Sequence, residues 1–322
     1  MDKQQVDIAY ANIKKDVLQT PLIHSSKLSE ISGAKVCLKL ENQQLTGSFK
    51  IRGVLNKMRS LDPADFDKTF VAASTGNHAA AFAYASARFG FKGKLFLPET
   101  VTEAKLKGLA GYEVEKLLYG NSSVEAEAKA TEHARDIDGV LVHPYNDEKI
   151  IAGQGTIGLE LCAQWPELDM VLAPIGGGGL ISGLCLAFSE NQAVSVRGCQ
   201  PHNASEMFDS LEQGKIVPPS TLSTLADAAA GGIEEGALTF DICKKHLDGI
   251  ELIEEEDMKK AVAFLHRFHD ITVEPTATLP VAALLKSKAY RGKNVALVLT
   301  GSKISQQLLN EIIAQYGNSD WS

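Results

Sequence analysis

A lysine stands at the point where a polar loop opens into a helical pattern. Lys50 lies within residues 47–53 (GSFKIRG), which follow the strand-like segment 34–40. The positive field at a helix N-terminus lowers the pKa of a nearby ammonium group. A lowered pKa suits Schiff-base chemistry, because only the free amine attacks a carbonyl carbon. On this segment alone, a solvated surface lysine is the simpler interpretation.

Residues 74–78 (STGNH) form a second polar segment, between a short buried run and an alanine-rich helical pattern. Backbone N–H groups at a helix N-terminus bind carboxylate or phosphate, and the side chains of Ser74, Thr75 and Asn77 can assist them. The same residue types are preferred as ordinary helix caps, so both interpretations stay open. A single histidine such as His78 is more often packed than catalytic.

Four consecutive glycines, Gly176, Gly177, Gly178 and Gly179, separate an apolar strand pattern (residues 170–175) from an apolar helix pattern. Without Cβ atoms, successive amides can converge on one anion, with the dipole of the following helix behind them. A flexible linker is the alternative, but linkers rarely sit tightly between an apolar strand and an apolar helix. The segment therefore predicts a phosphate site.

The segment lacks residues that nucleotide-binding motifs require, and this narrows the class of phosphate ligand. A dinucleotide fingerprint starting at Gly176 requires glycine at position 181, which is Ile181. The next strand pattern ends at Gln200, where an NAD-binding unit usually has an acidic residue. A Walker A loop requires a lysine, which Leu180-Ile181-Ser182 lacks. A single terminal phosphate therefore fits better than a nucleotide.

Thr300 follows the strand pattern of residues 295–299 and precedes Gly301. Ligands of open α/β sheets bind at the carboxyl ends of the strands, which makes a hydroxyl at this point a candidate ligand group. A polar turn that simply ends the strand explains the same residues equally well.

Strand-like and helix-like patterns alternate along the whole chain, which predicts an α/β fold with largely parallel sheets covered on both faces. The 322 residues suggest about two domains, and no Gly/Ser/Pro linker divides them. A chain that crosses between domains more than once explains the missing linker. The run 70–143 contains enough strand–helix units for a small inserted domain, and one large sheet is the alternative. The expected helices include residues 54–59 and 280–286.

Composition narrows the class of function. The chain is 44% hydrophobic and 22% charged, as expected for a globular protein with a core. Its formal charge is −8 and it has no long basic run, which argues against a nucleic-acid partner. The five cysteines are scattered and form no C-x-x-C pair, which suits a reducing compartment and argues against a zinc site. We find no signal-peptide pattern and no membrane-span pattern, and we expect a cytoplasmic protein.

Taken together and in this order, the segments resemble the fold-type II pyridoxal-phosphate enzymes, in the serine/threonine dehydratase and serine racemase branch. The resemblance runs from Thr20-Pro21-Leu22 to Thr300-Gly301. Its strongest parts are GSFKIRG (47–53), STGNH (74–78), IAGQGT (151–156), the four glycines and Glu274-Pro275-Thr276. One such match is weak evidence of kinship, but five in the family's order make coincidence improbable.

The resemblance implies a tryptophan synthase β-like fold of two three-layer α/β/α domains. The large pyridoxal-phosphate-binding domain would comprise residues 1–68 and 148–322, with residues 69–147 inserted as the small domain. The cofactor would be pyridoxal 5'-phosphate, joined to Lys50 as a Schiff base. The implied cofactor-binding residues are Phe49, Lys50, Asn77, Gly176, Gly177, Gly178, Gly179, Glu274 and Thr300. The implied substrate-binding residues are Ser74, Thr75, Gly76, Asn77 and His78, and the implied catalytic residues are Lys50 and Thr75.

The implied function is an ammonia-lyase (dehydratase) that converts a small β-hydroxy amino acid, of the serine, threonine or 3-hydroxyaspartate type, to a 2-oxo or imino acid, ammonia and water. Lys50 would remove the α-proton as general base. The alternatives are a serine-type racemase on the same scaffold and a weakly catalytic amino-acid-binding protein. Homodimerisation is expected from the resemblance alone. The 22 residues that follow Thr300 are too few for a regulatory domain, which favours an unregulated enzyme.

Two positions bear on the choice between lyase and racemase. Racemases of this branch have a serine where this chain has Thr75, and typical threonine dehydratases have an alanine there. Threonine keeps the hydroxyl but restricts its rotamer, so neither activity is excluded. Tyr145 stands where serine racemases usually have asparagine and dehydratases an aromatic residue, which favours the dehydratase.

Other departures concern a metal site and the surroundings of the cofactor. Related enzymes bind a divalent cation at positions that match Gln200, Ala204 and Glu206, where this chain has lost one carboxylate and lengthened another. Hard-cation affinity should fall, and we predict no metal. Ala228, Thr278 and Ser302-Lys303 also depart from the family pattern, which indicates an unusual substrate or an altered activity.

Overall fold

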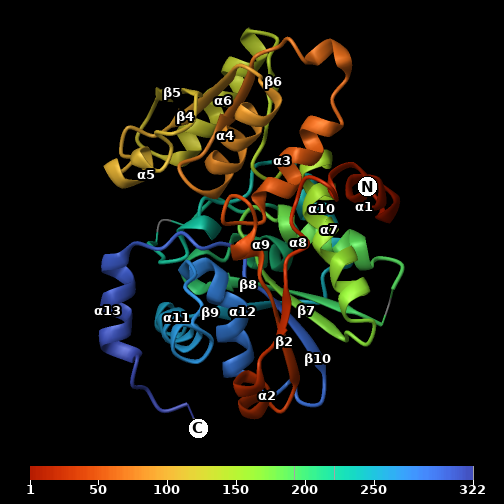
Figure 1. Cartoon of the computed structure of the whole chain (residues 1–322), viewed down its shortest axis with the longest axis vertical. Coiled ribbons are helices and arrows are strands. Elements are labelled where there is room, and N and C mark those ends of the chain that lie inside the picture. The colour runs from red at the N-terminus through yellow and green to blue at the C-terminus, as the bar shows by residue number, and fades with distance from the viewer. Residues whose placement is uncertain (192, 221, 322) are drawn as a thin grey trace.

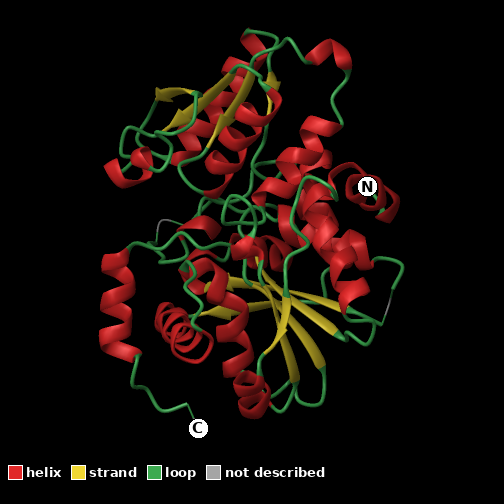
Figure 2. Cartoon of the chain, viewed as in Figure 1, coloured by secondary structure: helices red, strands yellow, loops and turns green. Residues whose placement is uncertain are grey.

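The computed structural model describes residues 1–191, 193–220 and 222–321. Its strands form two separate sheets, and helices cover both sheets (Figures 1 and 2). The α/β class expected from the alternating patterns is confirmed. No helix in the described parts of the chain is long and apolar enough to cross a membrane.

The larger sheet has six strands in the order β1-β2-β10-β7-β8-β9. All neighbours pair in parallel except β1, which runs antiparallel to β2. The strands are β1 (Leu22–His24), β2 (Lys35–Lys39), β7 (Met170–Pro174), β8 (Ser195–Pro201), β9 (Ile250–Ile253) and β10 (Asn294–Val298). The chain therefore leaves this sheet after β2 and returns to it at β7.

Alternate residues of the central strands belong to different cores, because side chains point to opposite faces of a sheet. On β7, Val171 and Ala173 join one buried cluster, whereas Leu172 joins another. Helices α7 (Glu148–Gln164), α8 (Gly179–Phe188) and α10 (Leu238–His246) pack into the first cluster. Helices α2 (Ser26–Ser32), α11 (Glu255–His269) and α12 (Pro275–Lys286) pack into the second.

The smaller sheet has four parallel strands in the order β5-β4-β3-β6, all between residues 70 and 141. They are β3 (Phe70–Ala73), β4 (Gly93–Leu97), β5 (Glu115–Leu118) and β6 (Val140–Leu141). Helix α4 (Asn77–Phe89) packs on the face that carries Phe70 and Ala72. Helix α6 (Ser123–Asp136) packs on the other face through its buried alanines 126, 130 and 134.

Helix α3 (Lys50–Arg59) packs against both α4 and α7 and so lies between the two sheets (Figure 1). The remaining α-helices are α1 (Lys3–Ile13), α5 (Glu103–Lys107), α9 (Glu206–Gln213) and α13 (Gln306–Tyr316). Short 3₁₀ turns are η1 (Glu41–Gln43), η2 (Pro63–Asp65), η3 (His202–Ala204) and η4 (Asp227–Ala229).

Two helices begin earlier than the sequence patterns indicated. The helix expected at residues 54–59 begins at Lys50. The helix expected from Pro280 begins at Pro275, with Glu274 as its N-cap and Pro280 inside it. Proline is favoured at the first helical position, which made Pro280 look like a start although Pro275 fills that position. The correction places Glu274 at a helix N-terminus.

Candidate active site

A cavity of about 700 Å³ opens between the two sheets, beyond the carboxyl ends of β3, β7 and β10. Every residue expected to bind the cofactor or the substrate lines it: Phe49 and Lys50, the loop 74–78, the glycines 176–179, Glu274 and Thr300. Carboxyl ends of parallel strands are where ligands of α/β sheets bind, so the topology accounts for this convergence.

Lys50 is the first residue of α3, and its side chain points into the cavity. Its Nζ donates to the carbonyl oxygen of Pro144 at 2.7 Å and lies 5.3 Å from the centre of the Phe49 ring. Burial lowers the pKa of Lys50 to about 8, although the negative charges of Glu127 and Glu274 oppose the shift. A larger fraction of free amine than an ordinary lysine has is therefore available near neutral pH, as attack on a carbonyl requires.

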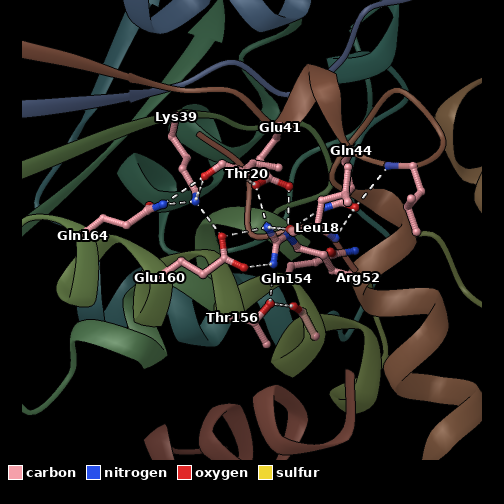
Figure 3. A network of polar contacts seen from close by, with 12 residues as sticks. Leu18, Thr20, Lys39, Glu41, Gln44, Arg52, Gln154, Thr156, Glu160 and Gln164 are labelled. Carbon is pink, nitrogen blue, oxygen red and sulfur yellow. Dashed lines mark hydrogen bonds and ion pairs between the residues drawn. The ribbon is translucent and has the colours of Figure 1, made fainter. Parts of the chain in front are cut away.

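A buried ion-pair network holds the first turn of α3 through Arg52, two residues after Lys50 (Figure 3). The Arg52 guanidinium donates to Glu41 at 2.8 Å and to Glu160 at 2.7 Å, and Lys39 pairs with Glu160 at 2.5 Å. The Arg52 and Glu41 side chains have no solvent exposure. Charges in such a place are tolerated only when each is paired and hydrogen-bonded. The network therefore fixes the segment that presents Lys50.

The loop between β3 and α4 presents backbone N–H groups and hydroxyls to the cavity. Gly76 has no side-chain cap partner at this helix start, and its N–H donates to Ser74 Oγ at 3.2 Å. His78 donates through Nε2 to the carbonyl oxygen of Val142 at 2.8 Å, because a carbonyl can only accept. Burial, reinforced by the charge of Lys50, lowers the pKa of His78 to about 3. His78 is therefore neutral and already committed as a donor.

The four glycines begin α8, with Gly178 as N-cap in a left-handed conformation (φ 90°). Side chains from other segments of the chain pack close against these glycines. A Cβ on Gly177 would lie 2.4 Å from the Tyr145 ring, and one on Gly178 would lie 2.8 Å from Thr239 Cβ. Only glycine fits these positions, and the result is a helix N-terminus open to an anion.

The segment around Thr300 is hydrogen-bonded to the loop that precedes Lys50. The backbone of Phe49 donates to the Thr300 carbonyl at 3.2 Å, and Ser48 forms a bridge with Gly301. Thr300 Oγ1 is buried and has no hydrogen-bond partner among the described residues. An unpartnered buried hydroxyl is costly unless a ligand completes it, which makes Thr300 a candidate ligand contact.

These features fit pyridoxal phosphate. Thr300 Oγ1 and Asn77 Oδ1 are buried without partners in the described structure, as expected of groups that face a polar ring. The glycine cradle suits the phosphate, and Lys50 is the amine available for the aldehyde. Each class of polar group on the cofactor therefore has a matching residue in the cavity.

Two charged residues of the smaller sheet's helices also line the cavity, and the sequence analysis missed both. Glu127 lies on α6 and Lys105 on α5. Lys105 Nζ lies 3.2 Å from Asp227 and 3.5 Å from Thr75 Oγ1. The sequence does contain a signal for Glu127. Ala126, Ala130 and Ala134 form a buried stripe on α6, and a carboxylate next to such a stripe lies at the edge of the core. No comparable signal identifies Lys105.

The three positions considered for a cation use their polar atoms within the protein. Gln200 donates to the Ala204 carbonyl at 3.4 Å and accepts from the backbone of Phe208 at 2.9 Å. Glu206 accepts from the backbone of Ser220 at 2.8 Å. Among the described residues, no group of three or more His, Cys, Asp or Glu side chains is placed to hold a metal ion.

Comparisons with known proteins agree with this geometry. Residues 13–301 match the family model described as "Pyridoxal-phosphate dependent enzyme". The L-threonine ammonia-lyase of Thermotoga maritima is 38% identical over 311 residues, which cover 96% of this chain and 77% of that protein. The catabolic L-threonine dehydratase TdcB of Escherichia coli is 34% identical, covering 92% of this chain and 91% of that protein.

A solved structure shows the same arrangement. The serine racemase of Dictyostelium discoideum superposes with a TM-score of 0.88 at 32% identity, covering 95% of this chain and 99% of that one. The family match, the relatives and the shared fold lead to one conclusion. The chain belongs to the pyridoxal-phosphate dependent enzymes, in their serine/threonine dehydratase and serine racemase branch, and pyridoxal phosphate is its cofactor.

Proposed function

We propose that this enzyme is an ammonia-lyase that converts a small β-hydroxy amino acid of the serine, threonine or 3-hydroxyaspartate type to a 2-oxo acid, ammonia and water. The observation that carries the proposal is the position of Lys50. It is a buried amine of lowered pKa, and it lies in one cavity with the polar loop 74–78 and the glycine cradle. The named activities of the relatives support the same reaction class.

The cofactor, when bound, supplies the electron sink that makes the α-proton acidic. The protein's own groups then have separate tasks. The glycines 176–179 hold the phosphate, Asn77 and Thr300 orient the ring, and Glu274 sits beside it. The amides and hydroxyls of the loop 74–78 bind the substrate carboxylate. Lys50 would take the α-proton as general base.

The division of the chain is part of the proposal. Residues 69–147 form the small inserted domain, and residues 1–68 and 148–322 form the large one. The two sheets support this division, because every strand of the smaller sheet lies between residues 70 and 141. We also propose a cytoplasmic homodimer, which size-exclusion chromatography with light scattering tests for the assembly state and cell fractionation tests for the location.

Racemisation is a second candidate, and Thr75 favours it. The Thr75 hydroxyl lines the cavity and accepts a hydrogen bond from Lys105 Nζ at 3.5 Å. A hydroxyl placed on the side of the substrate opposite Lys50 could return a proton to the α-carbon. Elimination and racemisation share the same first step, the removal of the α-proton.

Incubation with L- and D-serine, L- and D-threonine and the 3-hydroxyaspartates distinguishes these functions, when oxo acid and substrate chirality are measured together. Oxo acid without inversion supports the lyase. Inversion without oxo acid supports the racemase. Neither product, with a spectral change on binding, supports the weakly catalytic binding protein and contradicts the proposal.

A further inference from the structure

Loss of a β-hydroxyl requires a proton as well as a base, because hydroxide is a poor leaving group. The function proposed above assigns Lys50 to the α-proton and leaves the second proton without a donor. The donor must lie in the same cavity, carry an exchangeable proton near neutral pH and be free to give it. Of the titratable lining residues, Lys105 and Asp227 are paired with each other, and Lys303 donates to the Gly76 carbonyl at 3.1 Å. The other candidates among the described lining residues are His78, Tyr145, Glu274 and Glu127.

Three of these candidates are less suited to give a proton. His78 is neutral and its N–H is given to the Val142 carbonyl. Burial raises the pKa of the Tyr145 hydroxyl, which makes it a weaker acid than an ordinary tyrosine. Both carboxyl oxygens of Glu274 accept from the Asn77 side-chain amide, and the Glu274 backbone donates to the Gly301 carbonyl, so this group is held at the Thr300 segment.

Glu127 differs in position and in its contacts. Its neighbours Ala126 and Ala130 are buried against Val71 and Ala73 of β3, which fixes the rotation of α6 and turns Glu127 to the cavity. Its side chain is half-buried, and its carboxyl group makes no hydrogen bond or ion pair with any other described residue. Only its backbone carbonyl is engaged, by Thr131 at 3.0 Å.

Burial and three neighbouring charges act on the pKa of Glu127. Burial raises the pKa of its carboxyl group, and Glu234 adds to the rise, whereas His143 and Lys50 oppose it. His143 accepts the backbone N–H of Asn146 at Nδ1, 2.8 Å away, so its Nε2 hydrogen points to Glu234, 3.2 Å away. Glu234 thus takes the histidine's hydrogen bond and leaves the carboxyl group of Glu127 free.

We infer that Glu127 is the general acid that protonates the departing β-hydroxyl group, an inference that rests on the ammonia-lyase function proposed above. Lys50 takes the α-proton, and the electron pair of the Cα–H bond forms the Cα=Cβ double bond. The Cβ–O bond breaks with its electron pair moving to oxygen, and the Glu127 proton joins that oxygen. Water leaves and Glu127 becomes a carboxylate, which then recovers a proton from solvent. Lys50 and Glu127 therefore act from two helices, α3 and α6, that line the same cavity.

The test compares leaving groups that do and do not need a proton. In E127Q the shape is kept and the acid is lost, so kcat for L-serine should fall about 100-fold, the scale of general acid catalysis. Turnover of β-chloro-L-alanine should stay within about threefold of wild type, since chloride leaves without a proton. The matched control is E132Q on the same helix, whose carboxylate is exposed and paired with Lys129. It should leave both rates unchanged.

A measurement on the apoenzyme gives a readout other than turnover. Infrared difference spectra between acidic and basic pH should contain a protonated-carboxyl contribution that E127Q lacks and E132Q retains, beside the separate contribution of Glu274, which is present in all three proteins. Unchanged serine turnover in E127Q overturns the inference, and so does an equal loss for both substrates. A wild-type enzyme inert toward all hydroxy amino acids contradicts the proposed function itself. The two failures are therefore distinguishable.

Discussion

The side-chain amide of Asn77 donates to both carboxyl oxygens of Glu274, at 2.8 and 3.0 Å, across 197 residues of sequence. This pair joins the N-terminus of α4 in the smaller sheet to the N-terminus of α12 on the larger sheet. Burial raises the pKa of Glu274 to about 7, and the Asn77 bond opposes that rise. The carboxyl group is therefore near its midpoint under physiological conditions.

E274Q should change how the stability of the apoenzyme depends on pH. The folded pKa of about 7 lies above the ordinary value of 4.5, so the folded state binds the proton more tightly than the unfolded state. Between these two values the free energy of unfolding contributed by Glu274 falls as pH rises. E274Q removes that contribution. The urea midpoint should therefore fall less from pH 5 to pH 8 in E274Q than in wild type, and parallel curves would contradict the assignment.

Cofactor capture by the apoenzyme should follow the ionisation of Lys50. With a pKa of about 8, about a tenth of the amine is free at pH 7 and most is free at pH 9. The second-order rate of the absorbance change on adding pyridoxal phosphate should rise through that range and level off above it. K50A should show neither the absorbance change nor turnover. A rate that is independent of pH would contradict the lowered pKa.

The sequence predicted the segments of the site better than the elements around them. Residues 47–53, 74–78 and 176–179 carry local chemistry that can be recognised without a structure, and all three line the cavity. Their convergence could be expected because carboxyl ends of parallel strands share one edge of a sheet. Contacts such as Asn77–Glu274 could not be predicted, because they depend on how the two sheets are placed relative to each other.

Helix α7 shows what the patterns left out. Its 17 residues include Gly153, Gly155 and Gly158, which weaken a helical prediction. The structure explains them by close packing, since a Cβ on Gly153 would lie 2.6 Å from Gly53 Cα of α3. Here glycine allows α7 to pack closely against α3, which is a tertiary requirement that no local sequence pattern reveals. Glu127 and Lys105 were missed for a related reason, because their roles depend on helices that pack from the smaller sheet.

G177A should weaken cofactor binding by at least about tenfold. The new Cβ would lie 2.4–2.6 Å from the atoms of the Tyr145 ring, so the ring or the loop must move and the amides no longer converge on the phosphate. The dissociation constant for pyridoxal phosphate, measured by fluorescence titration, checks this. G111A is the matched control, since a Cβ at Gly111 meets no atom within 4 Å. Equal affinities in the two variants would contradict the phosphate assignment.

R52M should destabilise the fold and disturb Lys50 at a distance. Removing the guanidinium leaves the carboxylates of Glu41 and Glu160 buried, with only Lys39 nearby to balance them. Breaking a buried pair in this way costs about 3–5 kcal/mol, which urea denaturation of the apoenzyme measures. K260M, which breaks the exposed Lys260–Glu256 pair, should unfold like wild type.

The same variant separates anchoring from stability. In R52M the first turn of α3 loses its hold, so Lys50 should sample more positions and react more slowly with pyridoxal phosphate, even well below the unfolding midpoint. The double variant R52M/E41Q removes one of the stranded carboxylates and should recover part of the stability without recovering the reaction rate, since Lys50 remains unanchored. Equal recovery of both quantities would show that the network acts on stability alone.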